Sequence, residues 1–144
     1  MEKIKMTKIN NKKLFNLITS IPRIANKEKW ILTLDQEECA LFYAPKIIPS
    51  KSELHQLTDE YAVYTDKEFN PKGLVIDYYG VNFIKHHPEF EEITKEVFGE
   101  NKVKIKTVDL KNNKKKKKAI VLKALLERTL VSEAVEGSLI TNNN

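Results

Sequence analysis

Residues 30–43 read WILTLDQEECALFY, two short apolar runs on either side of a polar segment. The runs are Trp30–Leu34 and Cys39–Tyr43, and both are rich in aromatic and aliphatic residues that favour extended backbone. Residues 35–38 between them are all polar. This arrangement predicts a β-hairpin with a four-residue turn.

A second pair of apolar runs follows at Tyr61–Thr65 and Leu74–Tyr79. The turn-forming residues between them are Asp66, Asn70, Pro71 and Gly73. We expect a second hairpin here, with a bulge that Gly73 accommodates at positive φ. Residues 50–59 are mainly polar and predict a loop, with at most one helical turn. Together the hairpins predict an antiparallel sheet of four strands.

One helix is predicted before the sheet in the sequence, and two are predicted after it. Residues 12–21 have helical apolar spacing, and Pro22 is expected to end that helix. Proline and acids at residues 88–92 favour the start of a central helix, which ends at Gly99 and packs on the sheet. A long basic helix is predicted over residues 112–136, with Gly137 ending it.

The period-2 pattern of Lys102–Val108 predicts a fifth strand, at a sheet edge and with one cationic face. The fold class is therefore α+β: an antiparallel sheet of four to five strands packed by an N-terminal, a central and a long C-terminal helix. We interpret residues 1–136 as one domain, in which 1–9 form a flexible basic arm. Residues 137–144 are interpreted as a disordered tail.

The chain resembles a family of small bacterial two-hairpin domains in three stretches that follow one another: Asp35–Tyr43, Tyr61–Asp66 and Lys72–Asp77. The resemblance covers about residues 30–80. That family has no established function, and many of its members are encoded beside toxin-like genes. The resemblance implies an antitoxin-like or regulatory role and transfers no site residues. This chain departs from the family by having Cys39 where aspartate is usual, and by a longer turn at 66–73.

The formal net charge of +5 is distributed unevenly along the 144 residues. By segment, residues 1–34 carry +6, 35–100 carry −8, 101–128 carry +9 and 129–144 carry −2. The basic segments can neutralise the acidic centre of the chain itself or bind an external polyanion. Both interpretations remain open at the level of the sequence.

The lysine run, Lys114–Lys118, is the strongest indication of function. Clustered cations gain free energy by counterion release when they bind polyphosphates. We therefore predict a non-enzymatic binding or regulatory protein whose basic C-terminal segment contacts nucleic acid. No aromatic residues interleave with the run, so contact with the backbone is favoured over stacking on bases. The predicted nucleic-acid-binding residues are Lys111, Lys114, Lys115, Lys116, Lys117, Lys118, Lys123 and Arg128. The alternative is a solvated helix face.

A second hypothesis is a protein-interaction or immunity module in which the acidic central sheet binds a basic, toxin-like partner. Its partner-binding residues would be Glu37, Glu38, Glu60 and Glu68. A homodimer is a further possibility, joined through the apolar residues of the last helix: Leu122, Leu125, Leu126 and Leu130. Simple packing of that helix on the sheet is the alternative.

Catalysis, metals and cofactors are not predicted. His86, His87 and Glu91 could contribute zinc ligands, but no distant pair completes the set, and a capping role at the central helix is favoured. Cys39 could be a nucleophile, yet a strand position is the favoured interpretation. With one cysteine and no apolar run of transmembrane length, we expect a cytoplasmic protein without membrane association.

Overall fold

The computed structural model describes residues 11–35, 37, 39–99, 105–107 and 113–136, and it has the predicted α+β class. The helices are α1 (Asn11–Lys27), the π-helix η1 (Tyr79–Phe83), α2 (Ile84–His86), α3 (Phe90–Phe98) and α4 (Asn113–Glu136). The strands are β1 (Ile31–Asp35), β2 (Ala40–Ala44), β3 (Glu53–Gln56), β4 (Tyr61–Thr65), β5 (Pro71–Ile76) and β6 (Ile105–Thr107). The predicted arm at residues 1–9 and tail at 137–144 lie outside the described residues.

In the described part of the chain, the strands form one antiparallel sheet in the order β3-β4-β5-β2-β1-β6. The two predicted hairpins are confirmed as β1–β2 and β4–β5. In the first hairpin Asp35 pairs with Ala40, which leaves the four-residue turn expected from the sequence. Strand β6 pairs with β1 at one edge, and the rest of the predicted Lys102–Val108 strand lies outside the described residues.

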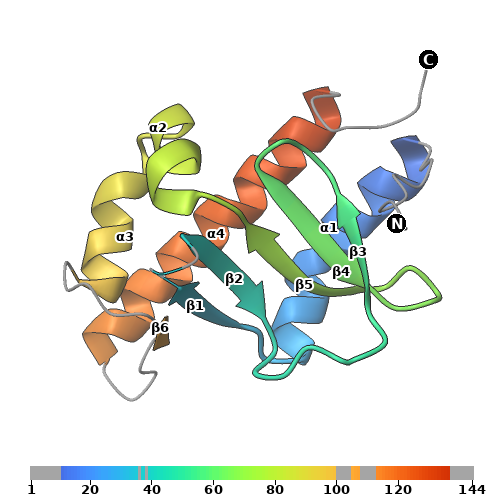
Figure 1. Cartoon of the computed structure of the whole chain (residues 1–144), viewed down its shortest axis with the longest axis horizontal. Coiled ribbons are helices and arrows are strands. Elements are labelled where there is room, and N and C mark those ends of the chain that lie inside the picture. The colour runs from blue at the N-terminus through green and yellow to red at the C-terminus, as the bar shows by residue number, and fades with distance from the viewer. Residues whose placement is uncertain (1–10, 36, 38, 100–104, 108–112, 137–144) are drawn as a thin grey trace.

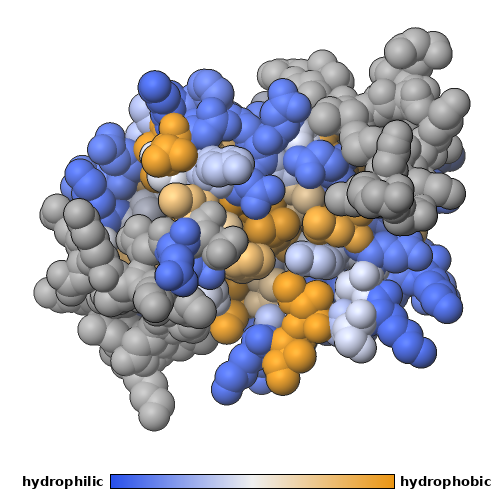
Figure 2. All heavy atoms as spheres, in the orientation of Figure 1, coloured by the Kyte–Doolittle hydropathy of each residue, from blue (hydrophilic) through white to orange (hydrophobic). Residues whose placement is uncertain are grey.

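Helices α1 and α4 lie together behind the sheet in the view of Figure 1, and they cover one of its faces. The main hydrophobic core lies between these helices and the sheet. It includes Trp30, Tyr61 and Phe90, all almost fully buried. The other sheet face carries a smaller apolar cluster of Ala40, Ala62, Val75, Phe42 and Tyr64. Apolar side chains gather over the centre of that face in Figure 2.

The prediction that Pro22 ends the first helix is wrong, because α1 continues to Lys27 with Pro22 inside it. A proline in a helix removes one backbone hydrogen bond and costs about 3 kcal/mol. Beyond it, Ile24 and Ala25 are buried and extend the apolar stripe formed by Leu17 and Ile21. Burying a side chain the size of Ile24 contributes about 1.5–3 kcal/mol, which offsets much of that cost.

The loop predicted for residues 50–59 contains a strand instead, because β3 pairs with β4 at the edge of the sheet. The inward position of this strand is taken by His55, whose Nε2 lies 2.8 Å from Oγ1 of Thr65. Leu54 points to the more exposed side. A polar residue therefore occupies the buried position and an apolar one the open position, so the usual alternation does not reveal the strand.

The predicted bulge in the second hairpin is present, but Gly73 does not adopt positive φ. Gly73 pairs with Tyr64 and Pro71 with Thr65, which leaves Lys72 as the extra residue. The left-handed residue of this turn is Phe69, with φ of 66°. A Cβ atom at Gly73 would lie 2.9 Å from Cβ of Ala44, so glycine is needed for close packing of β5 on β2.

The central helix is confirmed, with Gly99 at its end at φ 79°, but it packs on α4 rather than on the sheet. Its first residue is Phe90, since a turn over residues 87–90 leads into the helix. The Phe90 ring meets that of Phe83 edge to face, with centroids 5.0 Å apart. Helix α3 thus lies at the end of the molecule beside η1 and α2 (Figure 1).

The long C-terminal helix is confirmed as α4, and the leucines expected to join two copies of the chain are covered within it. Leu122, Leu126 and Leu130 are buried in the main core, and Leu125 is packed against it. The fold therefore favours intramolecular packing of these leucines over the homodimer face expected as an alternative. No described helix combines the length and apolar composition that crossing a bilayer requires.

Candidate anion-binding groove

A groove runs between the C-terminal half of α1 and the first half of α4. Its volume is about 640 Å³, and it is open to solvent along its length. Aliphatic and aromatic side chains form much of its wall, and the rest is polar or charged. The groove is lined by Pro22, Ala25, Asn26, Lys29, Trp30, Tyr43, Lys116, Ile120, Lys123, Ala124 and Glu127.

Three cations reach this groove from two directions. Lys29 stands in the turn after α1, in a left-handed conformation with φ of 56°. Lys116 and Lys123 come from α4, where a spacing of seven residues places them on one helix face. The structure therefore brings together two predicted nucleic-acid-binding residues and adds Lys29, which sequence reasoning missed.

Lys123 is the most constrained of the three cations. Its Nζ donates a hydrogen bond to the main-chain oxygen of Trp30 at 3.2 Å and lies 5.9 Å from the ring centroid of Tyr43. Burial lowers the pKa of Lys123, and the Glu127 carboxylate acts in the opposite direction. This ammonium group is therefore partly dehydrated and accessible from the groove.

Glu127 is the one acidic residue among the described residues that line the groove. The Tyr43 hydroxyl donates a hydrogen bond to its Oε2 at 2.9 Å. Burial raises the pKa of Glu127, while the Tyr43 hydrogen bond and the charge of Lys123 lower it. Sequence reasoning missed this residue, although Lys123 and Glu127 have the i,i+4 spacing of one helix face.

The remaining predicted cations diverge around α4. Lys117 and Arg128 lie on its exposed surface, while Nζ of Lys118 lies 3.2 Å from Oε1 of Glu96 on α3. Lys111 lies outside the described residues. Lys114 and Lys115 belong to the first turn of α4, and the structure does not describe their side chains. Part of the lysine run thus faces the groove and part binds α3.

The acidic residues predicted to bind a protein partner do not form one surface. Glu37 lies in the β1–β2 turn and Glu60 near the same end of the sheet, whereas Glu68 lies in the β4–β5 turn at the opposite end. Glu60 is moreover engaged by two histidines. Glu38 lies outside the described residues.

The two adjacent histidines converge on Glu60. Helix α3 has Glu89 at its N-cap and no side-chain capping hydrogen bond, so the capping role predicted for the histidines is wrong. His86 Nδ1 lies 2.5 Å from Oε2 of Glu60, and His87 Nε2 lies 3.3 Å from Oε1. His87 Nε2 also lies 3.7 Å from Oε2 of Glu133 on α4. Within the described residues, no three histidine, cysteine or acidic side chains are arranged to hold a metal ion.

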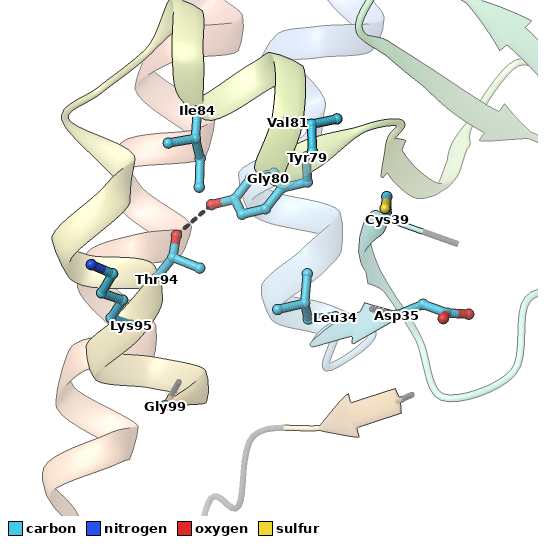
Figure 3. A pocket seen from close by; sticks show the side chains of 10 residues that line it. All are labelled: Leu34, Asp35, Cys39, Tyr79, Gly80, Val81, Ile84, Thr94, Lys95 and Gly99. Carbon is cyan, nitrogen blue, oxygen red and sulfur yellow. Dashed lines mark hydrogen bonds between the residues drawn. The ribbon is translucent and has the colours of Figure 1, made fainter. Parts of the chain in front are cut away.

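Cys39 lies in the turn before β2 rather than in a strand, with φ of 56°. It lines a pocket of about 220 Å³ between the end of the sheet, η1 and α3, together with Tyr79, Thr94 and Lys95 (Figure 3). The Tyr79 hydroxyl lies 2.7 Å from Oγ1 of Thr94. No histidine is among the described residues that line this pocket.

Comparison with known proteins finds no family model that matches the chain, and no similar curated protein or solved structure. The function has to be inferred from the groove and the surfaces beside it.

Proposed function

We propose that this chain is a non-enzymatic binding protein that holds a polyanion, nucleic acid in the first place, along the α1–α4 groove and the exposed side of α4. The observation that carries the proposal is the convergence of Lys29, Lys116 and Lys123 on one groove, against the single carboxylate of Glu127. Lys117 and Arg128 extend the positive surface along α4.

The chemistry of the groove favours the phosphate backbone over the bases. Its two aromatic residues, Trp30 and Tyr43, are buried and present no open ring face for stacking. The cations can approach phosphate oxygens, and each neutralised phosphate releases condensed counterions. We therefore expect binding that depends steeply on salt and weakly on sequence.

The experiment is a fluorescence-anisotropy titration with random duplex DNA and single-stranded RNA at several salt concentrations. The double variant Lys116→Gln/Lys117→Gln should bind more weakly to every sequence and lower the salt slope by about two. A matched control is Lys46→Gln/Lys51→Gln, which removes the same charge from the exposed loop after β2. Equal affinities for the two double variants would contradict the proposal.

A second candidate partner is an acidic protein segment, and one observation favours it. Ile120 and Val121 are 56% and 55% exposed beside the lysines of α4, where a phosphate backbone offers them no apolar contact. The antitoxin-like role implied by the family resemblance fits either partner. The variant Ile120→Ser/Val121→Ser distinguishes them, because it should leave nucleic-acid binding unchanged and weaken binding of a peptide that combines glutamate with leucine.

A further inference from the structure

We propose that Glu127 makes anion binding in the α1–α4 groove proton-linked: an anion bound by Lys123 comes to lie beside the Glu127 carboxylate, and Glu127 then takes up a proton from solvent. Affinity for the anion then rises as pH falls. This inference rests on the proposed function and concerns the regulation of that same groove.

The first step is the position of Glu127 inside the groove. Its carboxylate is held against the wall by the Tyr43 hydroxyl, at 2.9 Å, and stands one helical turn after Lys123. An anion drawn to Lys123 must therefore approach Glu127 as well. Two negative charges in such proximity repel each other, and protonation of the carboxylate removes the repulsion.

The second step is the set of charges that face Glu127. The Tyr43 hydroxyl contacts it from β2, and Lys123 is the cation that acts on it from α4, while Lys29 and Lys116 line the same groove further away. Without a bound anion, the Lys123 charge and the Tyr43 hydrogen bond favour the ionised carboxylate. A bound anion neutralises Lys123, and the balance then shifts towards the protonated form.

The third step is the free-energy cost of keeping Glu127 and Lys123 charged when both are partly buried. Burial raises the pKa of Glu127 and lowers that of Lys123, so each charged group is partly dehydrated. Lys123 therefore benefits from a close counter-ion. A neutral Glu127 can still accept the Tyr43 hydrogen bond through one oxygen, and its new O–H can donate to an oxygen of the bound anion.

The test measures the affinity for a fluorescent single-stranded RNA between pH 8 and pH 5.5 in wild type, Glu127→Gln and the control Glu96→Gln. Glutamine at 127 keeps an acceptor for Tyr43 and removes the charge. Glu96→Gln removes the same charge from α3, outside the groove, and retains all three histidines.

We expect Glu127→Gln to bind about tenfold more tightly than wild type at pH 8, as expected for removing one repulsive charge at close range in a partly solvated site. Its affinity should change less with pH than that of wild type and of Glu96→Gln. Equal pH dependence in all three proteins would overturn the inference while leaving the proposed function standing. No binding by any of them at low salt would contradict the proposed function itself.

Discussion

The Nδ1 atom of His86 lies 2.5 Å from Oε2 of Glu60, and His87 approaches the other oxygen of the same carboxylate. Glu60 stands in the turn between β3 and β4, so this contact ties the sheet to α2. Helix α4 joins the same cluster through Glu133, which accepts a hydrogen bond from Tyr61. One carboxylate thus connects segments that lie far apart in the sequence.

Removal of this carboxylate should lower the stability of the fold. Glu60→Ala removes the carboxylate that both histidines contact, and we expect a loss of about 1–3 kcal/mol in the free energy of unfolding, measured by urea denaturation. Glu89→Ala is the matched control, because Glu89 is exposed and lies 4.0 Å from His87. The control should change stability by less than about 1 kcal/mol. Equal losses would show that the cluster adds no specific stability.

Stability should also fall in acid because of His55. Its ring is buried beside Thr65 and Phe69, and burial lowers its pKa. The unfolded chain binds a proton at His55 more readily than the folded one, so the stability that the neutral ring supplies is complete above about pH 6.5 and declines below it.

Urea denaturation at pH 8 and at pH 5 measures this decline. In His55→Gln the loss between the two pH values should be smaller than in wild type, whatever the variant's stability at pH 8. If His55→Gln and wild type lose the same stability, His55 is not the group responsible.

The elements that the sequence predicted well are those in which apolar spacing agrees with burial. The two hairpins, α3 and α4 all have this property: in α4, for example, Leu122, Leu126 and Leu130 are spaced by four and all are buried. The strand β3 lacks it, because His55 takes the buried position. The predicted end of α1 at Pro22 was wrong for another reason: the apolar stripe continues beyond a residue that usually ends a helix.

The candidate site was predictable only in part, for a reason that lies in tertiary structure. The lysine run indicated the basic segment, but helical geometry sends Lys116 to the groove and Lys118 towards Glu96. Lys29 and Tyr43 meet these residues only because α1 and β2 pack beside α4. A pattern along one helix carries no information about such distant neighbours.

Gly73 should not tolerate even one added methyl group. Gly73→Ala places a Cβ atom 2.9 Å from Cβ of Ala44, and we expect a loss of about 1–3 kcal/mol in the free energy of unfolding. At Gly80 the structure offers no atom within 4 Å of an added Cβ. Gly80→Ala, within η1, should therefore be neutral or slightly stabilising. A comparable loss in both variants would point to backbone freedom rather than to crowding.

Pro22 imposes a cost on α1 that can be measured by removing it. In Pro22→Ala the new backbone N–H can donate to the carbonyl of Ile18, and the ring no longer crowds the preceding turn. The unfolded chain of the alanine variant also has more conformational entropy, which lowers the free energy of unfolding by about 0.4–1 kcal/mol. We expect a net stabilisation of about 2 kcal/mol or slightly more, measured by thermal and urea denaturation.

The control for this variant is Pro45→Ala, at the start of the loop between β2 and β3. There no helical hydrogen bond is restored, so only the gain in unfolded-state freedom remains and stability should fall by about 0.4–1 kcal/mol. The two substitutions are chemically identical and should change stability in opposite directions. A loss of stability in Pro22→Ala would contradict this prediction. It would mean that the proline costs α1 little, so that there is no large penalty for the burial of Ile24 to offset.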